Sequence, residues 1–131
     1  MTIELRTLLW SVVLGFVHIV AASHAASLQR GYRWTASARE GEVAPLTGVA
    51  GRLDRALRNY SETSPLFAAL VLVAHTAGRH SGLTESGAML YFVARLAYLP
   101  LYAFGVPLVR SLVWNVAGLG MALVFVALLL G

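Results

Sequence analysis

The sequence contains no cysteine and no lysine, and it has few charged side chains of any kind. The absence of cysteine excludes a disulfide, a thiolate nucleophile and a cysteine metal site, so any sulfur chemistry must come from a ligand. All ten basic residues are arginine, whose planar guanidinium binds carboxylates at two points. Only 12% of the residues are charged and 58% are hydrophobic, and the mean hydropathy is +0.71. This balance is not that of a soluble protein, and it predicts one integral membrane domain over residues 1–131.

Four apolar runs predict an all-α integral membrane four-helix bundle. The expected helices cover roughly residues 5–29, 52–78, 84–103 and 107–130. Small residues such as Gly118 and Ala122 are spaced to let the last helix approach a neighbour closely. A cleaved signal peptide is an alternative for the first run, but Thr7–Gln29 is longer than a usual signal core and Arg6 alone makes a thin positive region before it.

The connection over residues 30–51 is the only long loop, and it carries an excess of arginine over acidic residues. The positive-inside rule therefore predicts that this loop is cytoplasmic. With four spanning helices, both termini would then lie outside, in a multi-pass protein of the cell inner membrane. The lipid bilayer is accordingly the first expected partner.

The expected second helix begins with a polar face. At about 100° per residue, five polar side chains fall within an arc of about 120°. They are Arg52, Arg55, Arg58, Asn59 and Glu62. Only an uncharged stretch of sixteen residues, 63–78, separates Glu62 from the next charge, so Asn59 and Glu62 are expected inside the membrane edge. One side of this helix therefore faces something polar and anionic.

A second polar ridge lies on the expected third helix, where Tyr91, Arg95, Tyr98 and Tyr102 share an arc of about 60°. An arginine at mid-bilayer costs about 2.5–3.5 kcal/mol on the insertion scale, so the ridge is expected to face protein or ligand. A purely structural ion pair between Arg95 and Glu62 is the alternative.

Arg110 opens the expected fourth helix and is followed directly by Ser111. Alone, such an arginine is ordinarily one that reaches lipid phosphate. Here Arg55, Arg58 and Asn59 also lie toward the cytoplasmic side, so positive charge and hydrogen-bond donors gather at one inner rim above apolar helix surface. A small amphipathic anion fits that environment.

These residues resemble the MAPEG family, the membrane-associated proteins in eicosanoid and glutathione metabolism, in its bacterial type. The family's second helix carries arginine, arginine-alanine, asparagine, glutamate and proline-leucine-phenylalanine at fixed spacings. The matching positions here are Arg52, Arg55-Ala56, Asn59, Glu62 and Pro65-Leu66-Phe67. In the third helix the family's arginine, aromatic and tyrosine look like Arg95, Tyr98 and Tyr102.

The resemblance implies a homotrimer that binds glutathione between protomers near the cytoplasmic face. The resemblance also implies which residues bind glutathione. Together with the polar residues beside them, they are Arg30, Arg55, Arg58, Asn59, Glu62, Arg95, Tyr98 and Tyr102. It also implies that Arg110 stabilises the thiolate, with Ser111 as a hydrogen-bond donor, while glutathione serves as co-substrate and no metal is needed. The sequence departs from some glutathione-using members by carrying Leu57 and Thr63 where those have glutamine and tyrosine.

Two functional classes remain open. The first is a glutathione-dependent transferase or peroxidase that acts on lipophilic small molecules reaching it through the bilayer. The second is a non-catalytic lipid-binding or scaffold protein of the same fold. A channel is disfavoured because the charges form no rings along a pore. No metal site is expected since the histidine pairs lack i,i+4 spacing, and no basic soluble surface suits nucleic acid.

Overall fold

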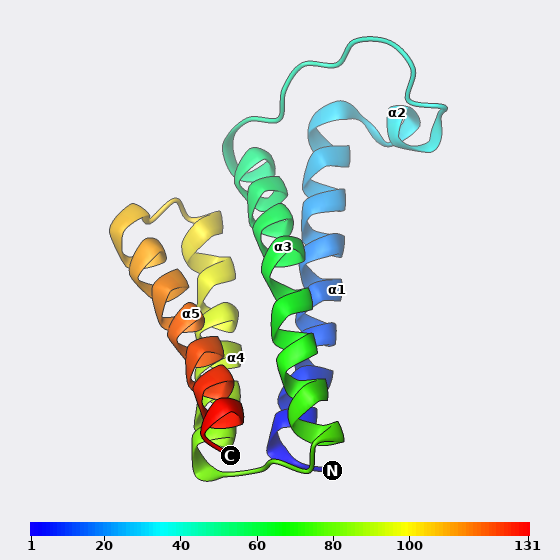
Figure 1. The fold of residues 1–131 in the computed structure, drawn as a ribbon. Helices are drawn as coiled ribbons and strands as arrows, with labels where there is room; N and C mark the ends of the chain where they lie inside the picture. The colour runs from blue at the N-terminus through cyan, green and yellow to red at the C-terminus, as the bar shows by residue number, and fades with distance from the viewer.

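The computed structural model describes all 131 residues and contains five helices and no strand, which confirms the all-helical class. Four of the helices are long and one is short, and Figure 1 shows how they are arranged. Their bounds are α1 Ile3–Arg30, α2 Tyr32–Ala36, α3 Gly48–Thr76, α4 Gly82–Ala103 and α5 Pro107–Leu130.

The four long helices run alternately up and down (Figure 1). They form two pairs, because α1 packs mainly on α3 and α4 packs mainly on α5. Both chain termini and the connection 77–81 lie at one end, which we call the termini end. The segment 31–47 and the turn 104–106 lie at the other, which we call the loop end. Helices α1 and α5 are long and apolar enough to cross a membrane.

The short helix α2 is a feature of the long loop that the sequence did not predict. It follows Gly31, whose φ of 95° permits a sharp change of direction directly after α1. The hydroxyls of Ser27 and Thr35 lie 2.8 Å apart, which ties α2 back to the end of α1. The first part of the loop is therefore folded against the loop end.

Local sequence signals set the other helix ends. Ser81 caps α4 in a capping box with Thr84, which satisfies backbone donors that would otherwise be unpaired. Pro107 stands at the first position of α5, where its missing N–H is not needed. The turn between them needs only three residues because Gly105 adopts a φ of 72°. This tight turn makes α4 and α5 antiparallel neighbours.

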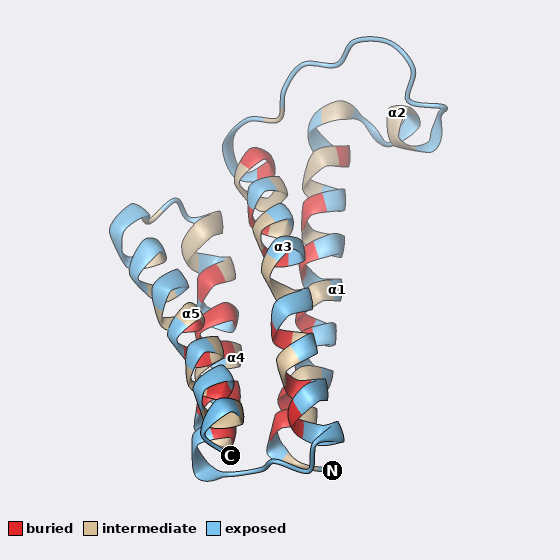
Figure 2. Ribbon diagram, in the orientation of Figure 1, coloured by how far each residue is buried: buried red, intermediate tan, exposed pale blue.

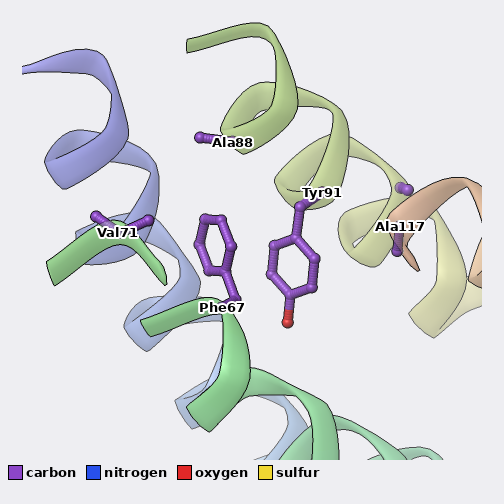
Figure 3. Packing of buried hydrophobic residues seen from close by; sticks show 6 residues of the cluster. Phe67, Val71, Ala88, Tyr91 and Ala117 are labelled. Atoms are coloured by element: carbon purple, nitrogen blue, oxygen red, sulfur yellow. The ribbon is translucent and has the colours of Figure 1, made fainter. Parts of the chain in front are cut away.

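The core lies where the two helix pairs meet. The rings of Phe67 on α3 and Tyr91 on α4 stack with centroids 4.0 Å apart, and Val71, Ala88 and Ala117 surround them (Figure 3). Burial is concentrated along these inward faces, whereas the outward faces are exposed (Figure 2). Stacked aromatic pairs of this kind add about 0.5–1.5 kcal/mol beyond the area they bury.

Close backbone approach between α4 and α5 depends on Gly87 and Gly120. A Cβ atom at Gly87 would lie 2.7 Å from the carbonyl oxygen of Gly120, and one at Gly120 would lie 2.6 Å from that of Gly87. Nothing lies within 4 Å of a Cβ placed at Gly118, so Gly118 takes no part in this contact, and its expected role in close packing against a neighbouring helix stays a prediction. The two helices meet instead along the adjacent glycine face.

Candidate functional site

A polar cavity of about 350 Å³ lies near the loop end, bounded by α3, α4 and α5. Its lining residues are Asn59, Tyr98, Tyr102, Arg110, Ser111, Trp114 and Asn115. Five of these are among the ten residues that the sequence predicted for the site. The structure thus brings half of the predicted set into one cavity, which we call the donor cavity.

Asn59 is held in the wall of the donor cavity by Arg95. The Arg95 Nη1 donates to Asn59 Oδ1 at 2.8 Å, and Arg95 is only 1% exposed. Its guanidinium carbon also lies 4.4 Å from the ring centroid of Tyr98 and 5.2 Å from that of Tyr60. The alternative prediction, a purely structural ion pair between Arg95 and Glu62, is wrong. Asn59, one helical turn before Glu62, accepts the hydrogen bond from Arg95, and Glu62 is exposed.

Tyr102 brings two further arginines to the cavity. The Arg55 Nε donates to the Tyr102 hydroxyl at 3.2 Å, and the Arg110 guanidinium lies 4.5 Å from the centroid of the same ring. Tyr98 packs edge-on against Tyr102 with centroids 5.4 Å apart. Since the Tyr102 oxygen accepts from Arg55, its own proton is free to be donated to a ligand. The cavity mouth therefore combines cations with a phenol donor.

The α5 side of the cavity is made by residues one turn apart. The Ser111 hydroxyl donates to the backbone oxygen of Pro107 at 3.1 Å, so Ser111 must change rotamer before it can donate to a ligand. Asn115 donates from Nδ2 to the backbone oxygen of Ser111 at 2.9 Å, which leaves its Oδ1 as an acceptor. Sequence reasoning missed Trp114 and Asn115 as lining residues, although the i,i+4 spacing from Arg110 and Ser111 was available as a signal.

The other five predicted residues do not line the donor cavity, and three of them, Arg30, Arg58 and Glu62, also form no hydrogen bond or salt bridge with its lining side chains. Arg58 forms an i,i+4 salt bridge with Asp54 at 3.0 Å. Arg30 donates to the backbone oxygen of Ala44 at 3.2 Å and lines a second polar cavity of about 490 Å³ with Arg55 and Arg58. Glu62 is exposed and forms no salt bridge. None of the larger cavities of the single chain therefore holds Arg55, Asn59 and Glu62 together.

A buried acidic site at the termini end was also missed. Glu4 is 1% exposed, and its Oε1 accepts from the Thr84 hydroxyl at 2.5 Å and lies 3.3 Å from His80 Nδ1. The available signal was a polar stripe on the first apolar run, in which Glu4, Thr7, Ser11 and His18 share one helix face of about 60°. All four are buried, and His18 stacks on Tyr60 with centroids 4.6 Å apart.

The comparison with family models agrees with the sequence motif and with the all-helical fold. The MAPEG family model matches residues 7–130, which is nearly the whole chain. The protein therefore belongs to the MAPEG family, and with two helices suited to cross a bilayer it is a membrane protein. The comparison with curated proteins finds none that matches this chain.

Proposed function

We propose that this protein is a glutathione-dependent membrane transferase or peroxidase that acts on lipophilic electrophiles. The observation that carries the proposal is the donor cavity, in which Asn59, Tyr102 and Arg110 offer N–H and O–H groups to an anion. Its volume, about 350 Å³, falls within the range of ordinary small-molecule sites. Both α1 and α5 also expose apolar faces from which a lipophilic substrate can approach.

Arg110 is the proposed thiolate-stabilising group. A thiol has a reference pKa of about 8.5, and a neighbouring guanidinium favours the nucleophilic thiolate. The ring of Tyr102 lies beneath the Arg110 guanidinium and restricts where the charge sits. In a transfer reaction the thiol gives its proton to water, its sulfur bonds to the electrophilic carbon, and the leaving group departs from that carbon with the electron pair of the broken bond. The chain needs no cysteine of its own for this chemistry.

A homotrimer is the proposed assembly, with glutathione bound between adjacent protomers. In support, Arg55 and Glu62 are exposed on the single chain, and the Glu62 carboxylate has no cationic partner there. A carboxylate of glutathione would pair with Arg55, while its amino group would pair with Glu62. Arg30 and Arg58, in the second polar cavity, would contribute from the neighbouring protomer. By the positive-inside rule, the excess of arginine in the loop supports a site near the cytoplasmic face and both termini outside.

The experiment is a calorimetric titration of the detergent-solubilised protein with glutathione, paired with a conjugation assay that uses a generic aromatic electrophile. Wild type is expected to bind and to turn over. Arg55→Ala is expected to weaken binding, because a charge-assisted hydrogen-bond donor is lost. Absence of binding at millimolar glutathione would remove the proposal, and binding without turnover would favour the second candidate.

The second candidate is a non-catalytic lipid-binding or scaffold protein of the same fold. It is favoured by an apolar groove between α1 and α3 that is as large as the donor cavity, about 350 Å³. Leu8, Phe16 and Phe67 are among its lining residues. In this case the polar residues of α3 serve assembly, so Glu62→Gln is expected to break up the trimer. A ligand-binding role for Glu62 predicts instead an intact trimer with weaker glutathione binding.

A further inference from the structure

Arg95 is the most deeply buried cation of the chain, yet it does not line the donor cavity. It lies eight residues before the end of α4 at Ala103, between the rings of Tyr60 and Tyr98. Its one hydrogen bond goes from Nη1 to Asn59 Oδ1 at 2.8 Å. Asn59, in contrast, does line the cavity. Any effect of Arg95 on a ligand therefore passes through the Asn59 amide.

The chemistry of the guanidinium fixes which way that amide points. Arginine has five N–H donors and no acceptor, so Asn59 must turn its oxygen toward Arg95. The other end of the planar amide, Nδ2 with its two N–H groups, is then the end left for the cavity. With a partner that could also accept, the amide could turn over and offer its oxygen to a ligand instead. Arg95 removes that possibility.

The consequence is an α3 wall of one chemical character. The α5 side is mixed, because Arg110 supplies N–H donors there, while Ser111 and Asn115 keep acceptor oxygens and each already donates to a backbone carbonyl of its own helix. On the α3 side, the Asn59 amide offers only N–H donors. A ligand group that packs on the α3 wall must therefore be an acceptor, and a carboxylate gives the strongest such hydrogen bond.

We propose that Arg95 is a positioning residue that locks the Asn59 amide with its N–H groups toward the donor cavity and thereby selects a ligand carboxylate on the α3 wall. This inference rests on the proposed function, since the carboxylate is taken to be one of those of glutathione. In this role Arg95 does not contact the ligand itself.

The test compares two ligands, glutathione and its diamide, in which both carboxylates are converted to carboxamides. Affinities are measured by calorimetry on the full-length protein in detergent. Wild type is expected to prefer glutathione by at least about tenfold. Arg95→Lys is expected to keep the preference, because an ammonium is also a donor without an acceptor. Arg95→Gln is expected to lower it by about tenfold, because glutamine can accept from Nδ2 and release the amide.

Arg95→Gln also removes a positive charge. A double-mutant cycle with Asn59→Ala is the control for that effect. If Arg95 acts through the amide, Arg95→Gln changes the preference no further once Asn59 is absent. A purely electrostatic role would lower it equally in both backgrounds and would overturn the inference. Should Arg95→Gln fail to fold, Asn59→Asp keeps a buried partner for Arg95. It is expected to lower the preference by about tenfold, because its second oxygen repels the ligand carboxylate on the α3 wall.

The outcomes separate this inference from the proposed function. No binding of glutathione by wild type would overturn both. Binding with no preference over the diamide, or equal preferences in Arg95→Lys and Arg95→Gln, would overturn the positioning role alone. An unchanged preference in Asn59→Asp would have the same consequence.

Discussion

The two ends of this molecule both bury charge, but they treat it in opposite ways. At the termini end, one oxygen of the Glu4 carboxylate is covered by the Thr84 hydroxyl and His80, and the side chain is sealed from the surface. At the loop end, Arg95 is buried equally well, but it serves Asn59, which opens onto a cavity with Arg110 at its edge. One end uses its polar groups to join helices, and the other leaves donors for a ligand.

The comparison teaches how to separate structural from functional polar residues in a membrane protein. Glu4 links the start of α1 to the start of α4, and no polar cavity adjoins it among the larger cavities of the chain. Asn59 has the same kind of buried partner but also faces open space. Burial alone does not distinguish the two ends, whereas a donor or acceptor left over beside a cavity does.

The largest expected effect is on catalysis at the loop end. Arg110→Ala should lower kcat for thiol conjugation by about 100-fold, because it removes the cation that is proposed to stabilise the thiolate. The thermal midpoint of unfolding should hardly change, since Arg110 is partly exposed and its recorded contact is with the Tyr102 ring. Steady-state kinetics and a thermal melt in detergent check both parts.

Arg33→Ala is the matched control for that prediction. Arg33 lies on α2 in the same half of the molecule, but it is exposed and lines neither the donor cavity nor the second polar cavity. Its stability change should stay within about 0.5 kcal/mol, because substitutions at exposed positions without such contacts have little effect. A loss of turnover as large as that of Arg110→Ala would show that general positive charge, and not the cavity, supports catalysis.

The next effect is on stability at the termini end. Glu4→Ala should lower the free energy of unfolding by about 1–2 kcal/mol, because the buried hydrogen bond that joins α1 to α4 is lost, although the Thr84 hydroxyl keeps the Ser81 backbone oxygen as an acceptor. Glutathione affinity should not change, because the donor cavity lies at the opposite end. Denaturant unfolding and calorimetry on the same preparation measure the two quantities. Glu42→Ala, in the exposed part of the loop, is the control and should leave both unchanged.

The smallest expected effect tests the Tyr102 hydroxyl. Tyr102→Phe keeps the ring beneath Arg110 but removes the oxygen that accepts from Arg55. Glutathione affinity should fall by about three- to tenfold, because one exposed, charge-assisted hydrogen bond and one phenol donor are lost. A Tyr102→Leu variant should lose more, since the ring disappears as well. Equal losses in the two variants would mean that the hydroxyl bonded to Arg55, and not the ring stacked on Arg110, carries the contribution of Tyr102 to binding.

The sequence could predict what depends on one helix at a time. The hydropathy of the runs indicated the all-helical class, and the shared face of Tyr98 and Tyr102 placed both on one wall of the cavity. The short helix α2 could not be predicted this way, because five residues carry too little periodicity. The MAPEG motif on the second helix likewise depends only on local spacing, and the family was confirmed.

What depends on two helices at once could not be predicted. The polar arc of the second helix spans about 120°, which is wider than the part that α4 and α5 cover, so Asn59 faces the cavity while Arg58 and Glu62 do not. The Glu4 site joins side chains about eighty residues apart in the sequence. Nothing in the spacing of either helix indicates that α1 and α4 meet there.

The most direct test of the account follows glutathione binding from inside the donor cavity. Trp114 lines the cavity, while Trp10 and Trp34 do not, so replacing those two by phenylalanine leaves a single local fluorophore. The account predicts a saturable change of Trp114 emission on glutathione addition, with the same Kd as calorimetry, weakened by Arg110→Ala and unchanged by Glu4→Ala. Calorimetric binding to which Trp114 does not respond would place the ligand elsewhere and contradict the account.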